Sequence, residues 1–307
     1  MIERKAIFAG YWYSGNKHDL EKDLKKHFNN ENFGPGALPQ SQNIEKRTII
    51  GGVSPHAGYT YSGPCAAFTY LNLFKERIPD TIIIFGTHHH SYRNIGIMTK
   101  GKWNTPLGDL QIDNELAETI LNNSDIIIED ESAFLRYEEH NIEIQLPFIK
   151  YCTGEKDTRI VPIKITRDID LKQLDSLSNT IANIIKRTDK DIVMVSSSDM
   201  SHYDVYNDIQ LKTLKEIDQI VIEQFVTFKS ENILDPRNVI SAEKYNKFRI
   251  DQREPSICGK QTIATLVAVG KKMNASKAKL LKYYTSKDIT SSGGSWTVGY
   301  FSGIIVK

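Results

Sequence analysis

Short runs of β-branched residues alternate along this chain with longer segments of helical spacing, and this alternation is what most constrains the fold. The clearest runs are residues 48–53, 81–85 and 192–195, each bounded by Gly, Ser or Pro. Runs of this kind are typical of buried strands. Strands that alternate with helices predict a three-layer α/β sandwich, in which helices flank a mixed, mostly parallel central sheet.

The remaining segments fit the same architecture. Helical spacing or capping predicts helices over 18–30, 114–122, 169–186, 209–228, 236–248 and 263–273, a helix that begins at Pro64 and ends near 74, and a helix over 142–149 despite Pro147. Further strands are expected at 159–165, 280–286 and 296–306, with an antiparallel excursion over 95–99 and 103–112. A turn at Gly293 and Gly294 is expected to join the last two strands. Asp113 is the expected N-cap of the helix over 114–122. No linker rich in Pro, Gly or Ser interrupts the pattern, so we expect one domain over residues 1–307.

Composition excludes several functional classes. The 307 residues contain 39 Lys plus Arg against 38 Asp plus Glu, so no broad basic field is present to bind nucleic acid. No apolar run approaches the ~20 residues of a membrane span, and no signal-peptide core follows the N-terminus. Three widely spaced cysteines do not suggest a disulfide framework. We therefore expect a cytoplasmic protein that binds neither nucleic acid nor membranes.

Three of the predicted strands end in short turns that deliver histidine. The first run leads to His56, the second to the cluster His88, His89 and His90, and the third through Ser196 to His202. Ligands of open α/β sheets bind beyond the carboxyl ends of the strands. The histidines are therefore expected to converge on one pocket.

A metal site is the chemistry that these residues favour. Imidazole and thiolate are natural ligands of borderline divalent metals, and Cys258 lies just before a predicted helix, whose exposed N–H groups favour the thiolate. A site of His56, one histidine of the second cluster and Cys258 leaves further coordination positions open. Sequence alone does not choose among His88, His89 and His90, because successive side chains point in different directions.

Other polar residues fall near the same turns. Asp199 and His202 are three residues apart, so both can face one pocket, Asp199 orienting and His202 exchanging protons. Glu139, His140 and Glu143 form a second acidic and imidazole group, although a structural role for His140 is also consistent with the sequence. Cys65 and Cys152 lie in apolar helical settings, which indicates packing.

The residues discussed above fall within a series of longer motifs. These are SPHAGYTYSG at 54–63, GTHH at 86–89, WNTPLG at 103–108, EHNIEIQLPF at 139–148, SSDMSH at 197–202 and ICG at 257–259. They span nearly the whole chain, and in this order they resemble the motifs of the Memo family, whose prokaryotic members are called AmmeMemoRadiSam system protein B. The resemblance implies the fold of the class III extradiol dioxygenases, non-haem iron enzymes that open catechol rings.

The resemblance also implies roles for individual residues. His56 and His89 match the two histidine ligands, and His202 matches the acid/base histidine. His88 occupies a slot that the family gives to a small residue, so the register between His88 and His89 stays open. Cys258 stands where the dioxygenases use a carboxylate, and His88, His140 and Glu143 would surround the ligands.

These expectations lead to three functional hypotheses. The first is a mononuclear, redox-active metal pocket in a metal-dependent oxidoreductase, with iron or copper preferred over zinc because thiolate softens the site. The second is a non-catalytic module that binds a peptide or phosphopeptide in the same pocket, lined by Tyr59, Tyr61 and Trp103. The third is an extradiol dioxygenase. The family name further implies a pathway shared with radical-SAM and AMMECR-like proteins.

Overall fold

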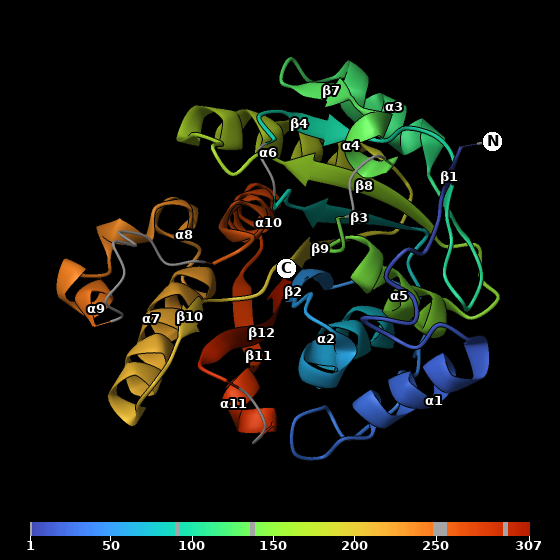
Figure 1. Ribbon diagram of the computed structural model, residues 1–307. Helices are drawn as coiled ribbons and strands as arrows, with labels where there is room; N and C mark the ends of the chain where they lie inside the picture. Colours follow the sequence, from blue (N-terminus) through green and yellow to red (C-terminus); the bar gives the residue numbers. More distant parts are fainter. Residues whose placement is uncertain (1, 90–91, 136–138, 248–256, 291–293) are drawn as a thin grey trace.

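A central sheet of nine strands organises the molecule (Figure 1), seen in a computed structural model that describes residues 2–89, 92–135, 139–247, 257–290 and 294–307. The strands of this sheet are β2 (Ile49–Ser54), β3 (Thr81–Gly86), β4 (Ile95–Ile97), β7 (Ile127–Glu129), β8 (Arg159–Ile165), β9 (Ile192–Ser197), β10 (His202–Asp204), β11 (Lys277–Thr285) and β12 (Trp296–Val306). The predicted α/β class is therefore confirmed.

The sheet is mixed. Its order is β10-β12-β2-β9-β3-β8-β4-β7, and β11 pairs with β12. The four central strands, β2, β9, β3 and β8, are parallel, whereas β12 and β4 run antiparallel to their central neighbours. The three strands expected to deliver histidine are thus adjacent, in the order β2-β9-β3.

Helices cover both faces of the sheet (Figure 1). The helices are α1 (Lys17–Phe28), α2 (Tyr59–Lys75), α3 (Asn114–Asn122), α4 (Glu131–Leu135), α5 (Leu146–Thr153), α6 (Leu171–Arg187), α7 (Asp208–Val226), α8 (Ser230–Leu234), α9 (Ala242–Asn246), α10 (Lys260–Lys272) and α11 (Ser286–Ile289), with short 3₁₀ turns η1 (Glu143–Gln145) and η2 (Pro236–Asn238). Helices α1, α2 and α5 pack on one side, and α6 and α10 on the other. The arrangement matches the predicted three layers.

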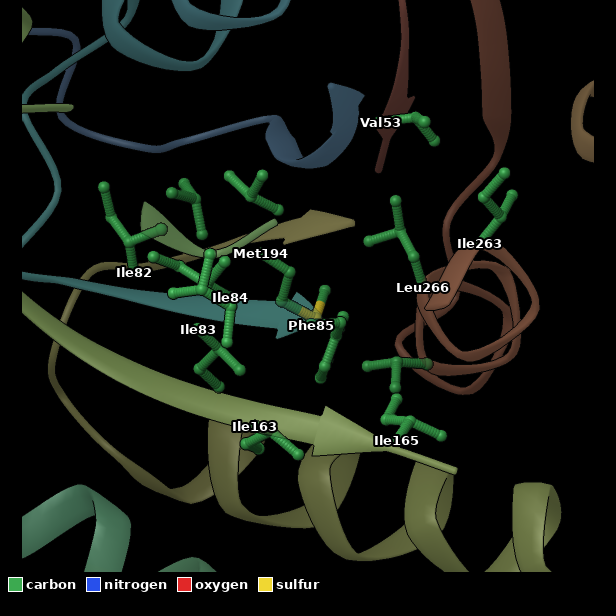
Figure 2. Close-up of a cluster of buried hydrophobic side chains, with 14 of the residues drawn as sticks. Val53, Ile82, Ile83, Ile84, Phe85, Ile163, Ile165, Met194, Ile263 and Leu266 are labelled. Atoms are coloured by element: carbon green, nitrogen blue, oxygen red, sulfur yellow. The ribbon is translucent and has the colours of Figure 1, made fainter. Parts of the chain in front are cut away.

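The core forms because the central strands are apolar on both faces. Figure 2 shows the isoleucines of β3 on both sides of the strand, with Ile263 and Leu266 of α10 beside them. Two glycines let the helices approach β2 closely. A Cβ at Gly51 would lie 2.7 Å from the Leu266 side chain of α10, and one at Gly52 would lie 2.9 Å from Thr69 of α2. Adjacent residues of β2 therefore face opposite helical layers.

A second, three-stranded sheet lies beside the first. It contains β1 (Glu3–Arg4), β5 (Lys102–Trp103) and β6 (Leu110–Gln111), in the order β1-β5-β6. The segment after β1 is then held by Glu143, whose carboxylate accepts hydrogen bonds from the backbone of Phe8 at 2.8 Å and the hydroxyl of Tyr13 at 2.9 Å. The N-terminal segment is thus fixed against the body of the protein.

One predicted boundary is confirmed. Helix α3 begins after Asp113, whose side chain accepts a hydrogen bond from Leu116 N, as an N-cap should.

The helix predicted over 142–149 has other bounds in the structure, where the 3₁₀ turn η1 precedes α5 and α5 extends to Thr153. Helix α5 tolerates Pro147 because this residue lies in the first turn, where its missing N–H would have no helical partner.

Two further boundaries predicted from the sequence are wrong. Helix α2 begins at Tyr59 rather than Pro64, because Gly58 O already accepts hydrogen bonds from Tyr61 N and Ser62 N. The continuous helix predicted over 236–248 is instead η2 followed by α9. Ser241 has an extended backbone that separates the two, and residue 248 lies outside the described residues.

Between β11 and β12, the described residues contain the short helix α11 where only a glycine turn was predicted. Gly293 of that predicted turn lies outside the described residues. Within the described part of the chain, no helix combines the length and the apolar content needed to cross a bilayer.

Candidate metal centre

The carboxyl ends of β2, β9 and β3 meet at one edge of the sheet, and the turns after them carry the candidate site. His56 follows β2, His89 follows β3, and Asp199 follows β9. Cys258 enters from another part of the chain, two residues before α10. The convergence expected from the sequence therefore has a simple origin in the strand order.

Three donor atoms from these segments lie together. His56 Nε2 is 3.1 Å from Cys258 Sγ, and His89 Nε2 is 3.3 Å from the same sulfur. All three atoms lie within 4.8 Å of one another. His56 and Cys258 are buried, whereas His89 is partly exposed. The structure thus brings His89, rather than His88, to Cys258.

Glu139 orients His89 from behind. Its Oε1 lies 2.9 Å from His89 Nδ1, and its Oε2 accepts the backbone N–H of the same residue at 2.8 Å. Burial raises the pKa of the Glu139 carboxyl, but the hydrogen bonds from His89 and the charges of His89 and His140 outweigh it and hold the pKa below its usual value. An ionised carboxylate can only accept, so His89 Nδ1 carries a hydrogen and Nε2 is left to face Cys258.

His56 is held on two sides. Its backbone N–H donates to Asp199 Oδ1 at 2.7 Å, and its Nδ1 lies 3.0 Å from Ser197 Oγ. Burial, followed by the neighbouring imidazoles of His140 and His89, lowers the pKa of His56 well below its usual value. The ring is therefore neutral at pH 7, the state in which imidazole binds a metal.

Cys258 owes its place to the glycine beside it. A Cβ at Gly259 would lie 2.8 Å from Ser197 O and from the side chain of Ser198, so only glycine lets this segment pack against the end of β9. Burial, followed by the charge of Asp199, raises the pKa of the Cys258 thiol well above its usual value. The expectation that the start of α10 would favour the thiolate is thus wrong for the metal-free protein, because burial outweighs the helix terminus.

Asp199 and His202 lie at the same site. The atoms His202 Nε2 and Asp199 Oδ2 are 3.8 Å apart, and His202 Nδ1 donates to Met200 O at 2.9 Å. Burial raises the pKa of Asp199 to about 7, although the hydrogen bond from His56 N opposes the rise. Near neutral pH the carboxyl group is therefore present in both protonated and ionised forms.

His140 forms an aromatic stack over the site. Its ring lies parallel to that of His89, with centroids 4.8 Å apart and planes 9° apart, and its other neighbours include Trp12 at 4.1 Å. Burial lowers the pKa of His140 to about 3, so this ring is neutral. The ring of His140 therefore lies between Trp12 of the N-terminal segment and His89.

These residues line one cavity of about 910 Å³. Its walls include His56, His89, His140, Asp199, His202 and Cys258, the aromatic residues Tyr11, Trp12, Tyr61, Trp296 and Tyr300, and the cations Arg167 and Lys287. A cavity of this volume, with polar groups gathered at one place, is typical of a small-molecule site.

Other candidate residues lie elsewhere. His88 is buried and stacks against Tyr92, with ring centroids 5.4 Å apart. Glu143 faces the N-terminal segment, where it pairs with Arg4 at 3.2 Å. His90 lies outside the described residues.

The aromatic residues expected along the pocket are only partly those observed. Tyr61 lines the cavity. Tyr59 instead donates its buried hydroxyl to Ile144 O at 2.7 Å, and Trp103 is buried against Phe134. The expectation is therefore wrong for Tyr59 and Trp103.

Sequence reasoning gave too little weight to three groups. Glu139, noted only as part of a loose acidic cluster, holds His89, and Ser197 lies against His56. Tyr11 and Trp12 supply a wall of the cavity from the N-terminus. Local signals existed for Glu139, which directly precedes His140, and for Ser197, which opens the motif SSDMSH, but none marks Tyr11 and Trp12.

Together, these features define an α/β protein with a His/His/Cys donor group at the carboxyl edge of its central sheet. The family model described as Memo-like protein matches residues 4–304. A MEMO1 family protein from Desulfurococcus amylolyticus is 39% identical over 304 residues, covering 98% of each chain. Another from Methanopyrus kandleri is 36% identical over 97% of each chain, and one from Methanosarcina mazei is 32% identical over the full length of both. This chain belongs to the Memo family.

Proposed function

We propose that this protein binds one metal ion through His56 Nε2, His89 Nε2 and Cys258 Sγ, and that the ion and the adjoining cavity together serve a metal-dependent redox reaction on a small molecule. The observation that carries the proposal is the convergence of these three donor atoms within 4.8 Å. They come from three segments that are far apart in the sequence, so local chain geometry does not account for their meeting.

The donor set fits a metal. A thiol has one hydrogen, and Cys258 Sγ faces two ring nitrogens at 3.1 and 3.3 Å. Because Glu139 accepts the Nδ1 hydrogen of His89, the other ring nitrogen, Nε2, is the one that faces the sulfur. A cation would be bound by the thiolate and both rings at once. The free energy of metal binding would offset the cost of removing the thiol hydrogen.

Imidazole and thiolate donors suit zinc as well as iron and copper. The proposed redox reaction requires iron or copper, because zinc has no redox chemistry. When bound, such a metal supplies electron transfer and Lewis acidity. The protein supplies the rest: Glu139 fixes the ring of His89, and His140 packs against it. The cavity admits a substrate beside the three donors.

Asp199 and His202 are the proposed proton-handling pair. His202 Nδ1 donates to the backbone carbonyl of Met200, and its Nε2 lies 3.8 Å from Oδ2 of the Asp199 carboxyl. A carboxyl group with a pKa of about 7 can both give and take a proton near neutral pH. Small movements would let a proton pass between the carboxyl group, the imidazole and a substrate in the cavity.

Elemental analysis tests the metal site. Untagged protein, purified anaerobically, should contain about one iron or copper ion per chain. The variants His56→Ala, His89→Ala and Cys258→Ala should each lose it. His18→Ala and Cys65→Ala change the same residue types away from the donor group and should retain the metal. Equal metal content in all five variants would remove the site.

A second candidate function is binding of a peptide without catalysis. It is favoured by the exposure of large aromatic side chains around the cavity, where Tyr11 is 88% exposed, Trp296 57% and Tyr61 40%. Such side chains can bury apolar or aromatic groups of a partner. A screen of peptides and phosphopeptides tests it: binding should be lost in Trp296→Ala. Binding that is weak and unaffected by this change would exclude the cavity as the peptide site.

Extradiol ring cleavage is the third candidate. The same cavity suits a catechol, but Cys258 replaces the hard carboxylate that an oxygen-activating iron centre prefers. Oxygen uptake with a panel of catechols and Fe(II) tests whether the protein cleaves catechol rings. We expect no uptake above that of Cys258→Ala.

A further inference from the structure

A chain of buried hydrogen bonds begins in α2, passes through η1 and the end of β9, and ends at the ring of His56. Its members are Tyr70, Gln145 and Ser197, and each is fully buried. Tyr70 OH lies 2.6 Å from Gln145 Oε1, Gln145 Nε2 lies 2.9 Å from Ser197 Oγ, and Ser197 Oγ lies 3.0 Å from His56 Nδ1. None of these three residues was singled out by the sequence.

The orientation of the Gln145 amide is fixed by a carbonyl. The amide atom that faces Ser197 also lies 3.1 Å from Pro55 O. A carbonyl oxygen only accepts hydrogen bonds, so the atom facing it must be the amide nitrogen. Gln145 therefore donates to Ser197 Oγ, and its own oxygen accepts from Tyr70.

The hydrogen of Ser197 is fixed in the same way. Ser197 Oγ lies 2.6 Å from Asn141 O, which is a backbone carbonyl and needs a donor at that distance. A hydroxyl has one hydrogen, and this contact uses it. Towards His56, Ser197 Oγ therefore has only a lone pair, so the hydrogen between these two residues must belong to His56 Nδ1.

We infer that Ser197, held by Gln145 and Asn141, is a positioning residue that fixes His56 in the tautomer with hydrogen on Nδ1 and a lone pair on Nε2. That lone pair points at Cys258 Sγ. Because Glu139 also accepts the Nδ1 hydrogen of His89, the sulfur faces the Nε2 atoms of both rings, an arrangement that a shared proton or a cation satisfies.

Asn141 connects the supports of the two histidines. Its backbone carbonyl accepts from Ser197 on the His56 side, and its side-chain Nδ2 donates to Glu139 Oε1 at 2.7 Å on the His89 side. One residue thus helps to set both rings. The segment that begins at Glu139 therefore prepares both imidazoles before any ligand binds.

The tautomer is measurable in the metal-free protein. Long-range ¹H–¹⁵N correlation spectra of protein labelled in histidine distinguish the two neutral tautomers, and loss of signals in His56→Gln assigns the ring. We expect His56 to have hydrogen on Nδ1 in the wild type. In Ser197→Ala its signals should shift towards the Nε2–H form, and Ser197→Thr, which keeps the hydroxyl, should restore them. The His89 signals serve as an internal reference and should not change.

Ser196→Ala is the matched control. Ser196 is equally buried and is the neighbouring residue of β9, but its hydroxyl lies 2.9 Å from Thr262 Oγ1 of α10 instead. This variant loses a buried hydrogen bond without touching His56, so its His56 spectrum should match the wild type. A wild-type His56 in the Nε2–H form, or a Ser197→Ala spectrum equal to that of Ser196→Ala, would overturn the inference.

A second measurement connects the tautomer to the metal, and this step rests on the proposed function. Loss of a hydrogen-bonding partner behind a metal ligand lowers metal affinity by roughly 10- to 100-fold. Co²⁺ titration should show that loss in Ser197→Ala but not in Ser196→Ala. If wild-type protein binds no Co²⁺, the metal site fails while the tautomer measurement still decides the inference. Wild-type binding with equal affinity in Ser197→Ala would overturn the positioning role alone.

Discussion

A single carboxylate, that of Glu139, holds His89 through both its ring and its backbone N–H. The change Glu139→Gln replaces a charged acceptor with a neutral amide of nearly the same shape. We expect metal affinity to fall by roughly 10- to 100-fold, because the acceptor behind a ligating imidazole raises its basicity and fixes its orientation. Titration with Co²⁺, monitored by absorbance, measures this affinity.

Glu76→Gln provides the comparison for that change. Glu76 is also a buried carboxylate that accepts backbone N–H groups, from Thr48 at 2.8 Å and Ile49 at 2.9 Å, but it lies at the opposite end of β2 from His56. The change Glu76→Gln should lower the free energy of unfolding and leave metal affinity within about twofold of the wild-type value. Equal effects of the two changes on affinity would show that Glu139 acts only through the fold.

His27 makes stability depend on pH at a place far from the cavity. Its ring packs against Tyr59 and Phe148, and burial lowers its pKa to about 4. The unfolded chain binds a proton near the ordinary pKa of 6.5, whereas the folded chain does so only near 4. Stability is therefore independent of this group above pH 6.5, falls as pH drops from 6.5 to 4, and is constant below.

The variant His27→Gln isolates that contribution. The difference in unfolding free energy between wild type and variant should shrink by about 2 kcal/mol from pH 7 to pH 4, less than the full shift implies because the ring is partly exposed. Urea denaturation at each pH measures it. A flat difference for His27→Gln would contradict the prediction.

At the scale of elements, two aspartates cap helices in contrasting surroundings. Asp170 is exposed, and among the described residues its side chain accepts a single hydrogen bond, from Gln173 N in the capping box of α6. Asp113, which caps α3, is buried and also accepts hydrogen bonds from Thr81 at 2.5 Å and Lys190 at 2.9 Å. The Asp113 side chain therefore connects α3 to Thr81 and Lys190 in addition to capping the helix.

The two caps should differ in energy accordingly. Asp170→Ala removes a surface cap and should cost about 1 kcal/mol. Asp113→Ala also leaves the hydroxyl of Thr81 without its acceptor and removes one of the two carboxylates that bind Lys190, whose contact with Glu115 at 2.9 Å stays. We therefore expect a larger loss, of about 3 kcal/mol. Chemical denaturation of both variants tests the ranking. Equal losses would show that the contacts of Asp113 outside α3 contribute little.

The elements also show what the sequence could predict about the site. Local patterns located β2, β3 and β9 and the histidines after them, because a buried strand and its glycine- or serine-rich end are local features. Their order in the sheet is set by packing between distant segments, so their adjacency could only be expected. The same limit applies to His89: the turn after β3, not the strand itself, decides which of its neighbouring histidines faces Cys258.

Residues that act through tertiary contact carried the weakest signal. Ser197 is an ordinary serine at the end of a strand, and its role arises from Gln145 and Asn141, more than 50 residues away. Trp12 reaches His140 because Arg4 and Glu143 fix the N-terminal segment. No periodicity or spacing marks such contacts, whereas the family motifs contain Gln145 and Asn141 without stating what they do.

At the scale of the whole molecule, the candidate ligands join distant parts of the chain. His56 follows β2, His89 follows β3, and Cys258 precedes α10. A bound ion would therefore connect Cys258 to residues 202 and 169 positions earlier in the chain, at the carboxyl edge of the sheet. Unfolding must break all of these connections. The ion should therefore stabilise the entire fold rather than one loop.

The size of this effect follows from mass action. An ion that binds only the folded state adds about 2.7 kcal/mol at a free concentration 100 times its Kd. For a protein of this length that corresponds to a rise in Tm of about 5 °C. Scanning calorimetry of reduced protein with and without added metal measures the rise, and a chelator should reverse it. His56→Ala should show no rise, whereas Cys65→Ala should respond as the wild type does, because Cys65 packs against Tyr284 and Tyr300, away from the donor group. An equal rise in His56→Ala and the wild type would place the stabilising ion elsewhere, and no rise in the wild type would contradict the metal centre itself.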